Sequence, residues 1–340
     1  MFNLLVEKFF SSPIKSYFSE IFGHFLSMKK FCLLLVFTAL SGMIMAQGFS
    51  RPLEWKKYRR ELFVSTGTSN FLGDLGGGKG AGRDYSPADL NFNQTRTAFG
   101  VGGRYKLQRT LNVVAKFSYL LVKGDDAITK DIYRNNRNLN FKSNIFELSG
   151  RIEYGYQRTK RGGGHYGVQK NYAKYKNFSH SIYGFVGLGV FYFNPKGKDA
   201  NGDWVKLRPL HTEGQGLIGG PKQYKRVSVS IPMGGYYKLT LSKVWSFGVE
   251  LCYRKTFTDY IDDVGYRYYN KADLLAAYGP KTVEMADPSL GLIYGATSPA
   301  ADGTPAQRGD KQKDTFISLE ITAGYTFKKQ RKSARLRSKF

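Results

Sequence analysis

The chain has 340 residues and carries 52 Lys and Arg against 26 Asp and Glu, which gives a formal net charge of +26. Two cysteines exclude a disulfide scaffold, and after the apolar run near the amino terminus no stretch approaches the roughly 18 apolar residues of a membrane-spanning helix. The mean hydropathy of -0.39 is typical of a soluble protein, but such an average hides strands in which apolar and polar residues alternate.

The first recognisable segment is 28–46, which is typical of a secretory signal peptide. A methionine and two lysines precede the apolar run 31–45, and Ala46 suits the cleavage site. Residues 1–27 come before this signal and indicate either a start codon assigned too early or an unusually long amino-terminal region. After cleavage one cysteine remains, Cys252, so the mature chain can form no internal disulfide.

The mature chain divides into an amino-terminal segment (47–60), a strand-rich region (61–327) and a basic tail (328–340). Apolar, aromatic and β-branched runs bounded by turn signals predict eight strands in the strand-rich region. In the sixth, Pro232 has no amide hydrogen for the ladder and predicts a bulge. The strands are expected near Glu61–Phe71, Thr97–Leu107, Leu111–Val122, Leu139–Gln157, Phe178–Phe193, Lys225–Leu241, Val244–Phe257 and Thr315–Phe327.

The seventh strand indicates which face meets which solvent. Every second residue from Trp245 to Tyr253 is large and apolar, whereas Glu250 and Arg254 occupy the other face. A basic side chain turned toward lipid near the midplane costs roughly 2–4 kcal/mol. The pattern therefore predicts a transmembrane strand with its charges toward the lumen, and the eighth strand alternates in the same way.

The connections between strands alternate between short and long, as in bacterial outer-membrane barrels. Short turns lie around Arg109 and Ser242, and one expected short turn, 158–177, is long. We predict an all-β fold, an eight-stranded antiparallel transmembrane β-barrel of the outer-membrane type with long extracellular loops, a plugged lumen and both termini in the periplasm. A soluble lipocalin-like barrel, which reverses the two faces, is the alternative.

The inward positions carry charges of both signs. The interior of an eight-stranded barrel is only wide enough to be filled by side chains, so an ion-pair network that plugs the lumen is favoured over an acid–base site or an open pore. Within it, Glu250 is expected to pair with Arg254 or Arg151. The predicted members are Arg104, Lys116, Glu147, Arg151, Glu153, Glu250, Arg254 and Glu320.

The positive charge is concentrated in the segments predicted to be periplasmic, which hold 20 basic residues and one acid, Glu54. Such a face attracts anions. Nucleic acid is excluded as a partner because a secreted barrel has little access to it, which leaves phospholipid headgroups of the inner leaflet and a periplasmic protein. The basic residues singled out are Arg158, Lys160, Arg161, Lys170, Lys174, Lys176, Lys328, Lys329, Arg331 and Lys332.

No motif indicates catalysis, a metal or a cofactor, and we expect none of the three. The mature histidines match no hydrolase or metal pattern, although His211 and Glu213 occupy a loop where a lipid-modifying enzyme could carry such residues. Residues 199–203 resemble the start of a calcium loop but lack its distal glutamate, which favours a turn. The Arg-Gly-Asp tripeptide at 308–310 is of a kind that occurs by chance.

Several segments beside the strands carry a family resemblance over about residues 61–327. The more specific segments are Leu207-Arg-Pro209 with Thr212-Glu-Gly-Gln-Gly216, and Thr256-Phe-Thr-Asp-Tyr260. The less specific segments are Phe71-Leu-Gly-Asp74, Arg137-Asn-Leu-Asn-Phe141 and Phe193-Asn-Pro-Lys196. They resemble the Por-G-like outer-membrane proteins of Bacteroidetes. The resemblance implies a type IX secretion component that holds the periplasmic ring of the Por-K lipoprotein and Por-N at the outer membrane. It supplies no catalytic residues and no contact residues for this chain.

The sequence therefore predicts a non-enzymatic barrel in the outer membrane of a Gram-negative bacterium, where it anchors periplasmic components of the type IX secretion system. Its expected partners are outer-membrane lipid and a periplasmic lipoprotein ring complex. The alternatives are a stand-alone structural or surface-binding barrel and, less favoured, a lipid-modifying outer-membrane enzyme.

Overall fold

The structure, a computed structural model, describes residues 54–75, 92–129, 131–159, 179–241, 244–265, 267–293, 295–297, 306–310 and 312–328. These residues belong to the second of the two units into which the chain divides, Glu54–Phe340. The predicted signal peptide, the Gly-rich part of the first long loop, most of the turn at 158–177 and the tail beyond Lys328 lie outside the described residues.

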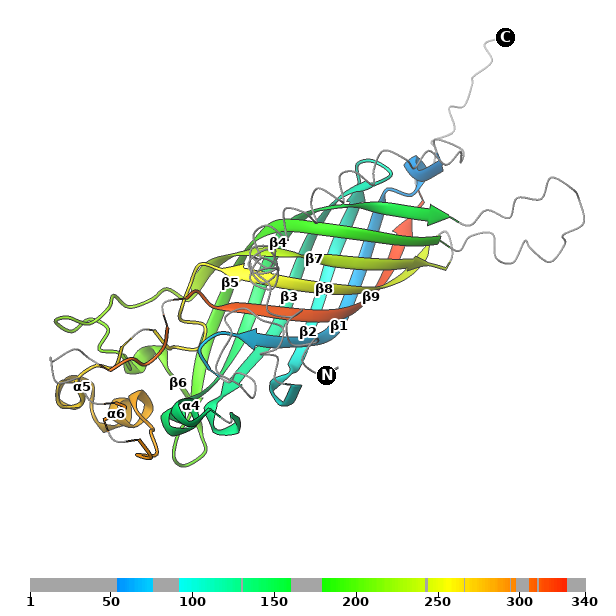
Figure 1. The fold of residues 1–340 in the computed structure, drawn as a ribbon. Coiled ribbons are helices and arrows are strands. Elements are labelled where there is room, and N and C mark those ends of the chain that lie inside the picture. Colours follow the sequence, from blue (N-terminus) through cyan, green and yellow to red (C-terminus); the bar gives the residue numbers. More distant parts are fainter. Residues whose placement is uncertain are drawn as a thin grey trace, which may run out of the picture. The chain divides into compact units, whose positions relative to one another are not determined.

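Eight long antiparallel strands form a closed barrel (Figure 1). The first strand pairs with the last, with Arg60 opposite Phe327 and Leu72 opposite Thr315. Because the ring closes, no long strand leaves an unpaired edge, and the predicted fold is confirmed. The strands are β1 (Arg60–Leu72), β2 (Arg96–Lys106), β3 (Leu111–Asp125), β4 (Asn140–Thr159), β5 (Ser179–Lys198), β7 (Val227–Thr240), β8 (Trp245–Thr256) and β9 (Thr315–Phe327).

Shorter elements lie before the barrel and in its connections. A three-residue strand, β6 (Trp204–Lys206), pairs with the end of β5. Among the described residues, no helix is long and apolar enough to cross a membrane. The helices are α4 (Ile132–Arg137), α5 (Lys271–Tyr278) and α6 (Pro280–Ala286), with the 3-10 turns η2 (Glu54–Lys57), η4 (Phe92–Gln94), η5 (Asp126–Ile128) and η7 (Arg208–Leu210).

The outward face of the barrel is apolar, and the strand period of two places it there. In β1, Leu62 and Val64 are 55% and 59% exposed, whereas Phe63 between them is 2% exposed. The phase predicted for β8 is the one observed, because Leu251 faces outward and Glu250 is fully buried. A continuous apolar band with charges inside suits lipid and excludes the lipocalin-like alternative.

The two ends of the barrel differ. The turn 107–110 lies at one end, together with the end of β7, the start of β8, the start of β1 and the end of β9; we call this the short-turn end. The described residues of the long connections 73–95, 126–139, 199–226 and 257–314 lie at the other, the loop end. This rhythm of short and long connections is the predicted one.

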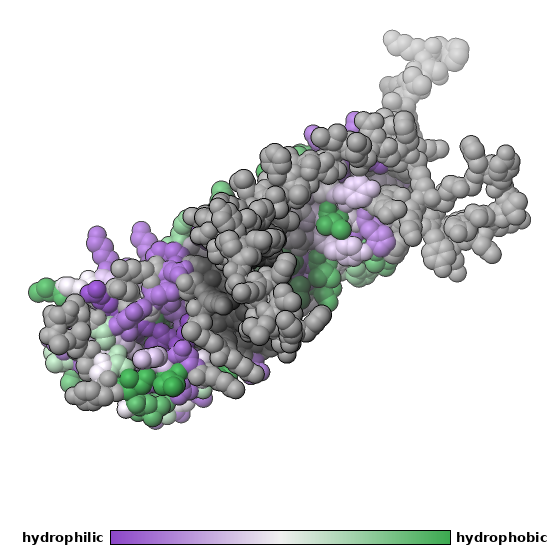
Figure 2. Space-filling model, viewed as in Figure 1, coloured by the Kyte–Doolittle hydropathy of each residue, from purple (hydrophilic) through white to green (hydrophobic). Residues whose placement is uncertain are grey.

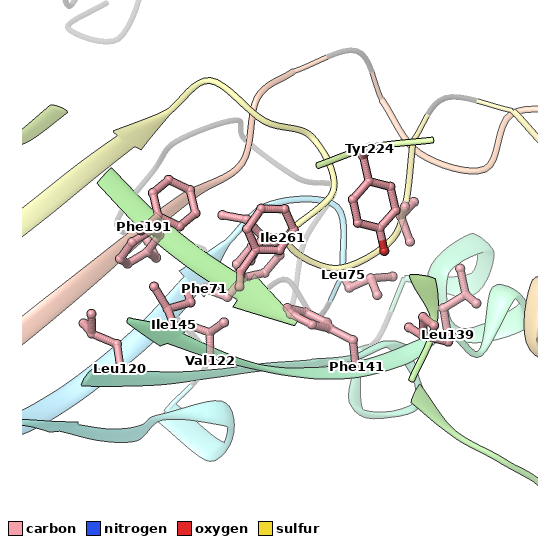
Figure 3. Packing of buried hydrophobic residues seen from close by; sticks show 14 of the residues in the cluster. Phe71, Leu75, Leu120, Val122, Leu139, Phe141, Ile145, Phe191, Tyr224 and Ile261 are labelled. Carbon is pink, nitrogen blue, oxygen red and sulfur yellow. The ribbon is translucent and has the colours of Figure 1, made fainter. Parts of the chain in front are cut away.

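The hydrophobic core lies toward the loop end (Figure 3). Inward aromatic residues from the loop-end halves of the strands, such as Phe71 and Phe141, contact each other edge to face with ring centroids 4.7 Å apart. Side chains from the connections, including Tyr224 and Ile261, pack on them. The core therefore joins the long loops to the barrel.

One local prediction, a bulge at Pro232, is wrong. On the side of β5, the pairs Val186–Met233 and Gly189–Ser230 keep one register across the proline. On the side of β8, Pro232 lies opposite Arg254 in an unbroken register. The proline interrupts the ladder with β5, but no extra residue is inserted.

Candidate functional site

All eight charged residues predicted to point inward lie in the lumen, and each is at most 3% exposed. Glu61 and Lys238 join them, so that among the described residues five acids and five bases form the network. Each of the five carboxylates has at least one basic partner. The arrangement is therefore electrically balanced.

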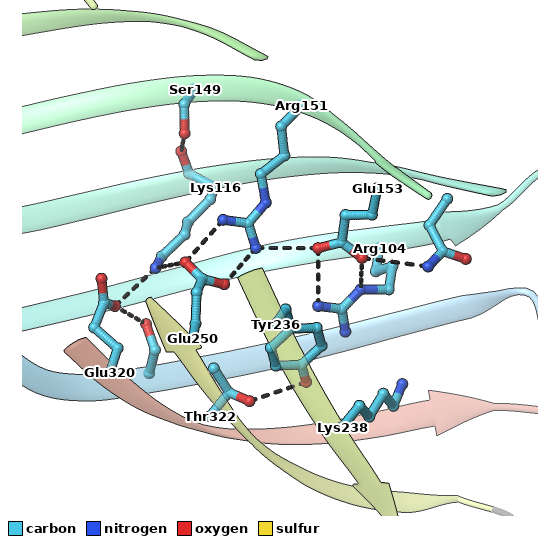
Figure 4. A network of polar contacts seen from close by, with 12 residues as sticks. Arg104, Lys116, Ser149, Arg151, Glu153, Tyr236, Lys238, Glu250, Glu320 and Thr322 are labelled. Carbon is cyan, nitrogen blue, oxygen red and sulfur yellow. Dashed lines mark hydrogen bonds and ion pairs between the residues drawn. The ribbon is translucent and has the colours of Figure 1, made fainter. Parts of the chain in front are cut away.

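Two arginines link carboxylates across the lumen (Figure 4). Arg104 on β2 donates to both oxygens of Glu153, at 2.7 and 3.2 Å, and to Oε1 of Glu61 at 2.8 Å. Arg151 on β4 donates from Nη1 to Oε1 of Glu250 at 2.8 Å and from Nη2 to Glu153 at 3.1 Å. The planar fork of a guanidinium can hold two carboxylates at once, so these contacts tie four strands together.

Lys116 and Arg254 continue the network. Lys116 Nζ donates to Glu250 at 3.0 Å and to Glu320 at 2.7 Å, and so joins β3 to β8 and β9. Arg254 Nε donates to Glu147 at 2.6 Å. Of the two partners expected for Glu250, the structure pairs it with Arg151, while Arg254 contacts Glu147 and, at 3.8 Å, Glu320.

Aromatic side chains fill the space around these charges. The rings of Tyr236 and Phe63 face the Arg104 guanidinium, with their centroids 4.5 and 4.9 Å from its central carbon. Cys252 is buried and free in the same lumen. Ion pairs and rings together plug the barrel, and the hydroxyls of Ser65 and Ser230 donate to Glu320 and Glu147, each at 2.6 Å.

Glu61 and Lys238 are not among the lumen residues predicted from the sequence, although the signal was present. Glu61 precedes Leu62 and Lys238 follows Tyr237, both of which face outward. A strict period of two therefore places both charges inside. Glu61 accepts hydrogen bonds from Arg104 and Lys238.

The short-turn end carries exposed basic side chains. Lys56, Lys57, Arg60, Arg109 and Lys328 are exposed there, whereas the nearby carboxylate of Glu61 is turned into the lumen. Of the basic residues singled out from the sequence, the structure places Lys328 at this end and Arg158 on β4, the side chain of Arg158 being undescribed. The others lie outside the described residues: Lys160, Arg161, Lys170, Lys174, Lys176, Lys329, Arg331 and Lys332.

At the opposite end the long connections form a folded layer, which we call the loop cap and define as the described residues of 73–95, 126–139, 199–226 and 257–314. Its surface is largely hydrophilic, with a smaller hydrophobic patch (Figure 2). At its centre, Arg308 Nη1 donates to Glu213 Oε1 at 2.9 Å and to the backbone oxygen of Asp263 at 2.8 Å. The Asp263 carboxylate accepts hydrogen bonds from Thr212 and Tyr224.

Arg137, at the end of α4, connects three segments of the loop cap. Its Nε donates to Asp126 at 2.7 Å, and its two terminal nitrogens donate to the backbone oxygens of Arg308 and Asp74, at 2.6 and 2.7 Å. Asp74 in turn accepts from the amide of Asp310 at 3.0 Å. These contacts hold the cap as one structure rather than as separate loops.

Several cap carboxyls are buried, and burial disfavours their charged form. Burial raises the pKa of Asp74 to about 7, and the Asp310 carboxylate adds to this. Burial also raises the pKa of Asp263 to about 6, although the nearby Arg308 opposes the shift. Protons therefore bind to the cap near neutral pH.

The weaker sequence motifs have structural explanations in the cap. His211 Nδ1 contacts the backbone oxygen of Gln215 at 2.7 Å, whereas Glu213 pairs with Arg308. Residues 199–203 form a tight turn with Gly202 at φ +91°. In the Arg-Gly-Asp tripeptide, Arg308 is buried and cannot be displayed to a receptor.

The sequence matches no protein-family model and no curated protein. Solved structures with a similar arrangement include the outer membrane protein OprG from Pseudomonas aeruginosa (9% identity, TM-score 0.31, 80% of this chain and 98% of that chain). A second is the N-terminal β-barrel domain of Pseudomonas aeruginosa OprF (7% identity, TM-score 0.29, 79% of this chain and 98% of that chain). A third is Ail, the attachment invasion locus protein of Yersinia pestis (9% identity, TM-score 0.30, 79% of this chain and 98% of that chain). At these scores the likeness carries no argument, and the fold rests on the strand pairing itself.

Proposed function

We propose that the protein is a non-enzymatic barrel of the outer membrane of a Gram-negative bacterium and that it anchors periplasmic components of a type IX secretion system. In this arrangement the short-turn end and both termini face the periplasm, and the loop cap faces the outside. The basic short-turn end is the observation that carries the proposal, and the sequence resemblance to the Por-G-like proteins of Bacteroidetes supplies the candidate partner, a periplasmic lipoprotein ring.

The charge of the short-turn end supports a docking role. Five exposed basic side chains lie at this end, whereas the carboxylate of Glu61 at the start of β1 is paired with Arg104 inside the lumen. Complementary charge of this kind steers association and sets the orientation of a partner. A partner with an acidic surface fits this end.

The plugged lumen supports an anchor over a channel. The residues that cross the lumen, such as Arg104, Glu153 and Glu250, are fully or almost fully buried, and their contacts join strands across the barrel. Such a cross-linked barrel is a stiff support for a complex built on one end. We therefore assign no transport role to it.

The test is co-purification from detergent-solubilised outer membranes. Lys56, Lys57 and Lys328 are exchanged together for Gln, and the matched control exchanges three exposed lysines of the loop end, Lys206, Lys222 and Lys225, in the same way. The short-turn variant is expected to lose the periplasmic ring lipoprotein at 0.1 M salt, and the control to retain it. Native barrel should also lose it near 1 M salt, because the Debye length falls from about 10 Å to about 3 Å.

Equal recovery with both variants, and at both salt concentrations, contradicts docking through this end. Phospholipid headgroups are then the remaining target of the basic residues. Loss of export of proteins with C-terminal sorting domains in a deletion strain separates a secretion component from a stand-alone barrel.

The ordered loop cap favours a second candidate function, binding at the cell surface. Its connections are held together by the Arg308–Glu213 and Arg137–Asp126 ion pairs rather than left separate. Binding by the cap and anchoring by the short-turn end involve opposite ends of the barrel and do not exclude each other.

A further inference from the structure

A cavity of about 520 Å³ lies within the loop cap. Its size is within the range of about 300–1,000 Å³ found for small-molecule sites. Its walls come from residues 138–140 at the start of β4, residues 198–202 between β5 and β6, residues 262–264 after β8, and residues 284–289 at the end of α6. These segments belong to three of the long connections, and Leu75 adds the fourth, 73–95, so four connections must fold together to form the cavity.

Two buried ionic side chains line the cavity and each keeps a polar atom without a partner. Asp262 is 1% exposed; its Oδ1 accepts from the amide of Val264 at 3.0 Å, and its Oδ2 has no hydrogen-bond partner. Arg308 is 2% exposed; its Nη1 is used by Glu213, and its Nε has no partner. The cavity lining therefore holds one acceptor without a partner, Asp262 Oδ2, and one donor without a partner, Arg308 Nε–H.

The other charges of the lining are mostly compensated. Lys281 Nζ contacts Asp199 at 2.6 Å and Glu284 at 3.2 Å, and Lys271 contacts Asp287 at 2.5 Å. An anionic ligand would meet these carboxylates, and a cation would meet Arg308. The lining consequently suits a ligand without a net charge.

We infer that this cavity binds a neutral polyhydroxylated molecule of the size of a mono- or disaccharide. A hydroxyl group is both donor and acceptor, so the hydroxyls of such a molecule can pair with Asp262 Oδ2 in either protonation form and accept from Arg308 Nε–H. The side-chain amides of Asn138 and Asn201 provide further donors and acceptors, and the apolar walls at Leu139 and Met285 suit the C–H faces of a sugar ring.

The protonation of Asp262 also favours hydroxyls over amines. Burial raises the pKa of Asp262 well above its ordinary value, and the Asp74 carboxylate adds to this, while Arg137 opposes it. The carboxyl is therefore held closer to its neutral form. A hydroxyl can pair with either form, whereas an ammonium gains most from the charged one.

The inference is tested on the full barrel, purified in a detergent without a sugar headgroup, by ligand-observed NMR titration. The probes are glucose, galactose, mannose and maltose, with glucuronate as the charged counterpart of glucose. We expect at least one neutral sugar to bind at a single site. Asp262→Leu removes both carboxyl oxygens, so a ligand hydroxyl loses this partner in either protonation form of the carboxyl, and binding should weaken by about tenfold or more.

Two further variants keep the test sharp. Ala200→Trp places a large side chain at an exposed position of the cavity lining and should abolish binding with heat-modifiability unchanged. Asp273→Asn, an exposed exchange on α5 away from the lining, should bind as the native protein does. Binding by none of the four sugars, binding that survives both Asp262→Leu and Ala200→Trp, or glucuronate binding as tight as that of glucose would each overturn the inference. None of these results depends on the proposed secretion role.

Discussion

At the scale of single residues, the lumen charges depend on one another for their stability. Glu250 is fully buried and holds both Arg151 and Lys116, at 2.8 and 3.0 Å from its Oε1. A buried ion pair contributes little compared with a well-packed apolar pair, but removing one partner leaves an uncompensated charge. Replacing a lumen carboxylate by an uncharged residue is therefore expected to destabilise the barrel.

Glu250→Ala should destabilise the barrel by about 3–5 kcal/mol, because it leaves two buried cations with fewer partners. The measurement is the urea midpoint of the refolded barrel, with heat-modifiability on gels as a second readout. Asp273→Ala on α5, where the carboxylate is exposed, is the control and should change the midpoint little. A Glu250→Ala midpoint equal to that of the control would show that water reaches the network, and a plugged lumen would then be wrong.

At the scale of elements, the phase of β8 can be tested directly. Single cysteines at Phe247, Val249 or Leu251, in a chain with Cys252 replaced by Ser, should react with a lipid-soluble maleimide in membranes. These three positions are 42%, 45% and 49% exposed on the outer face, whereas native Cys252 is 1% exposed in the lumen. Native Cys252 should therefore stay unmodified, and the reverse pattern would indicate a barrel with its apolar face inside.

The loop cap should lose stability as pH rises through the range of its raised carboxyl pKa values. A carboxyl with a folded pKa above its unfolded value binds its proton more tightly in the folded state, so stability falls as pH rises above the unfolded pKa. For Asp263, whose pKa is raised from 3.8 to about 6, the loss is on the order of 3 kcal/mol and is complete above about pH 7. Asp74, whose pKa is raised to about 7, extends this pH range upward.

Hydrogen exchange of cap amides, corrected for the intrinsic rate, measures this effect. Protection in the segments around Gly265 and Asp310 is expected to be higher at pH 5 than at pH 8, with the β-strand amides as the internal reference. The dependence should shrink in Asp263→Asn, which cannot ionise. Cap protection that is constant or increases toward pH 8 would mean that these carboxyls remain charged and hydrated.

The strands were predictable from the sequence, because their signal is local. In β8 and β9 the alternation of residues such as Leu251 and Glu250 follows from the period of two alone, and it also assigns the lumen charges to the inside. Which charges meet depends on strand register and on positions across the barrel. The pairing of Glu250 with Arg151 joins residues 99 positions apart and could only be given as one of two options.

At the scale of the whole molecule, the loop cap was not predictable. Arg308 and Glu213 are 95 positions apart in segments without periodicity, so no sequence pattern brings them together. The bulge predicted at Pro232 is absent for a related reason. Strands β5 and β8 pair with β7 on its two sides and hold its register, so the missing amide hydrogen removes one ladder hydrogen bond and does not shift the strand. The charge of the short-turn end, in contrast, could be counted from the sequence, and its role remains the proposal.

The most direct measurement of that role is site-specific photocrosslinking in living cells. A photoreactive residue replaces Gln108 in the exposed turn between β2 and β3, or Lys222 in the loop cap as the matched position at the other end. Docking through the short-turn end predicts that position 108 forms an adduct with a periplasmic lipoprotein, and that no adduct forms when isolated membranes are irradiated near 1 M salt. An adduct with that lipoprotein at position 222 and none at position 108 would contradict it.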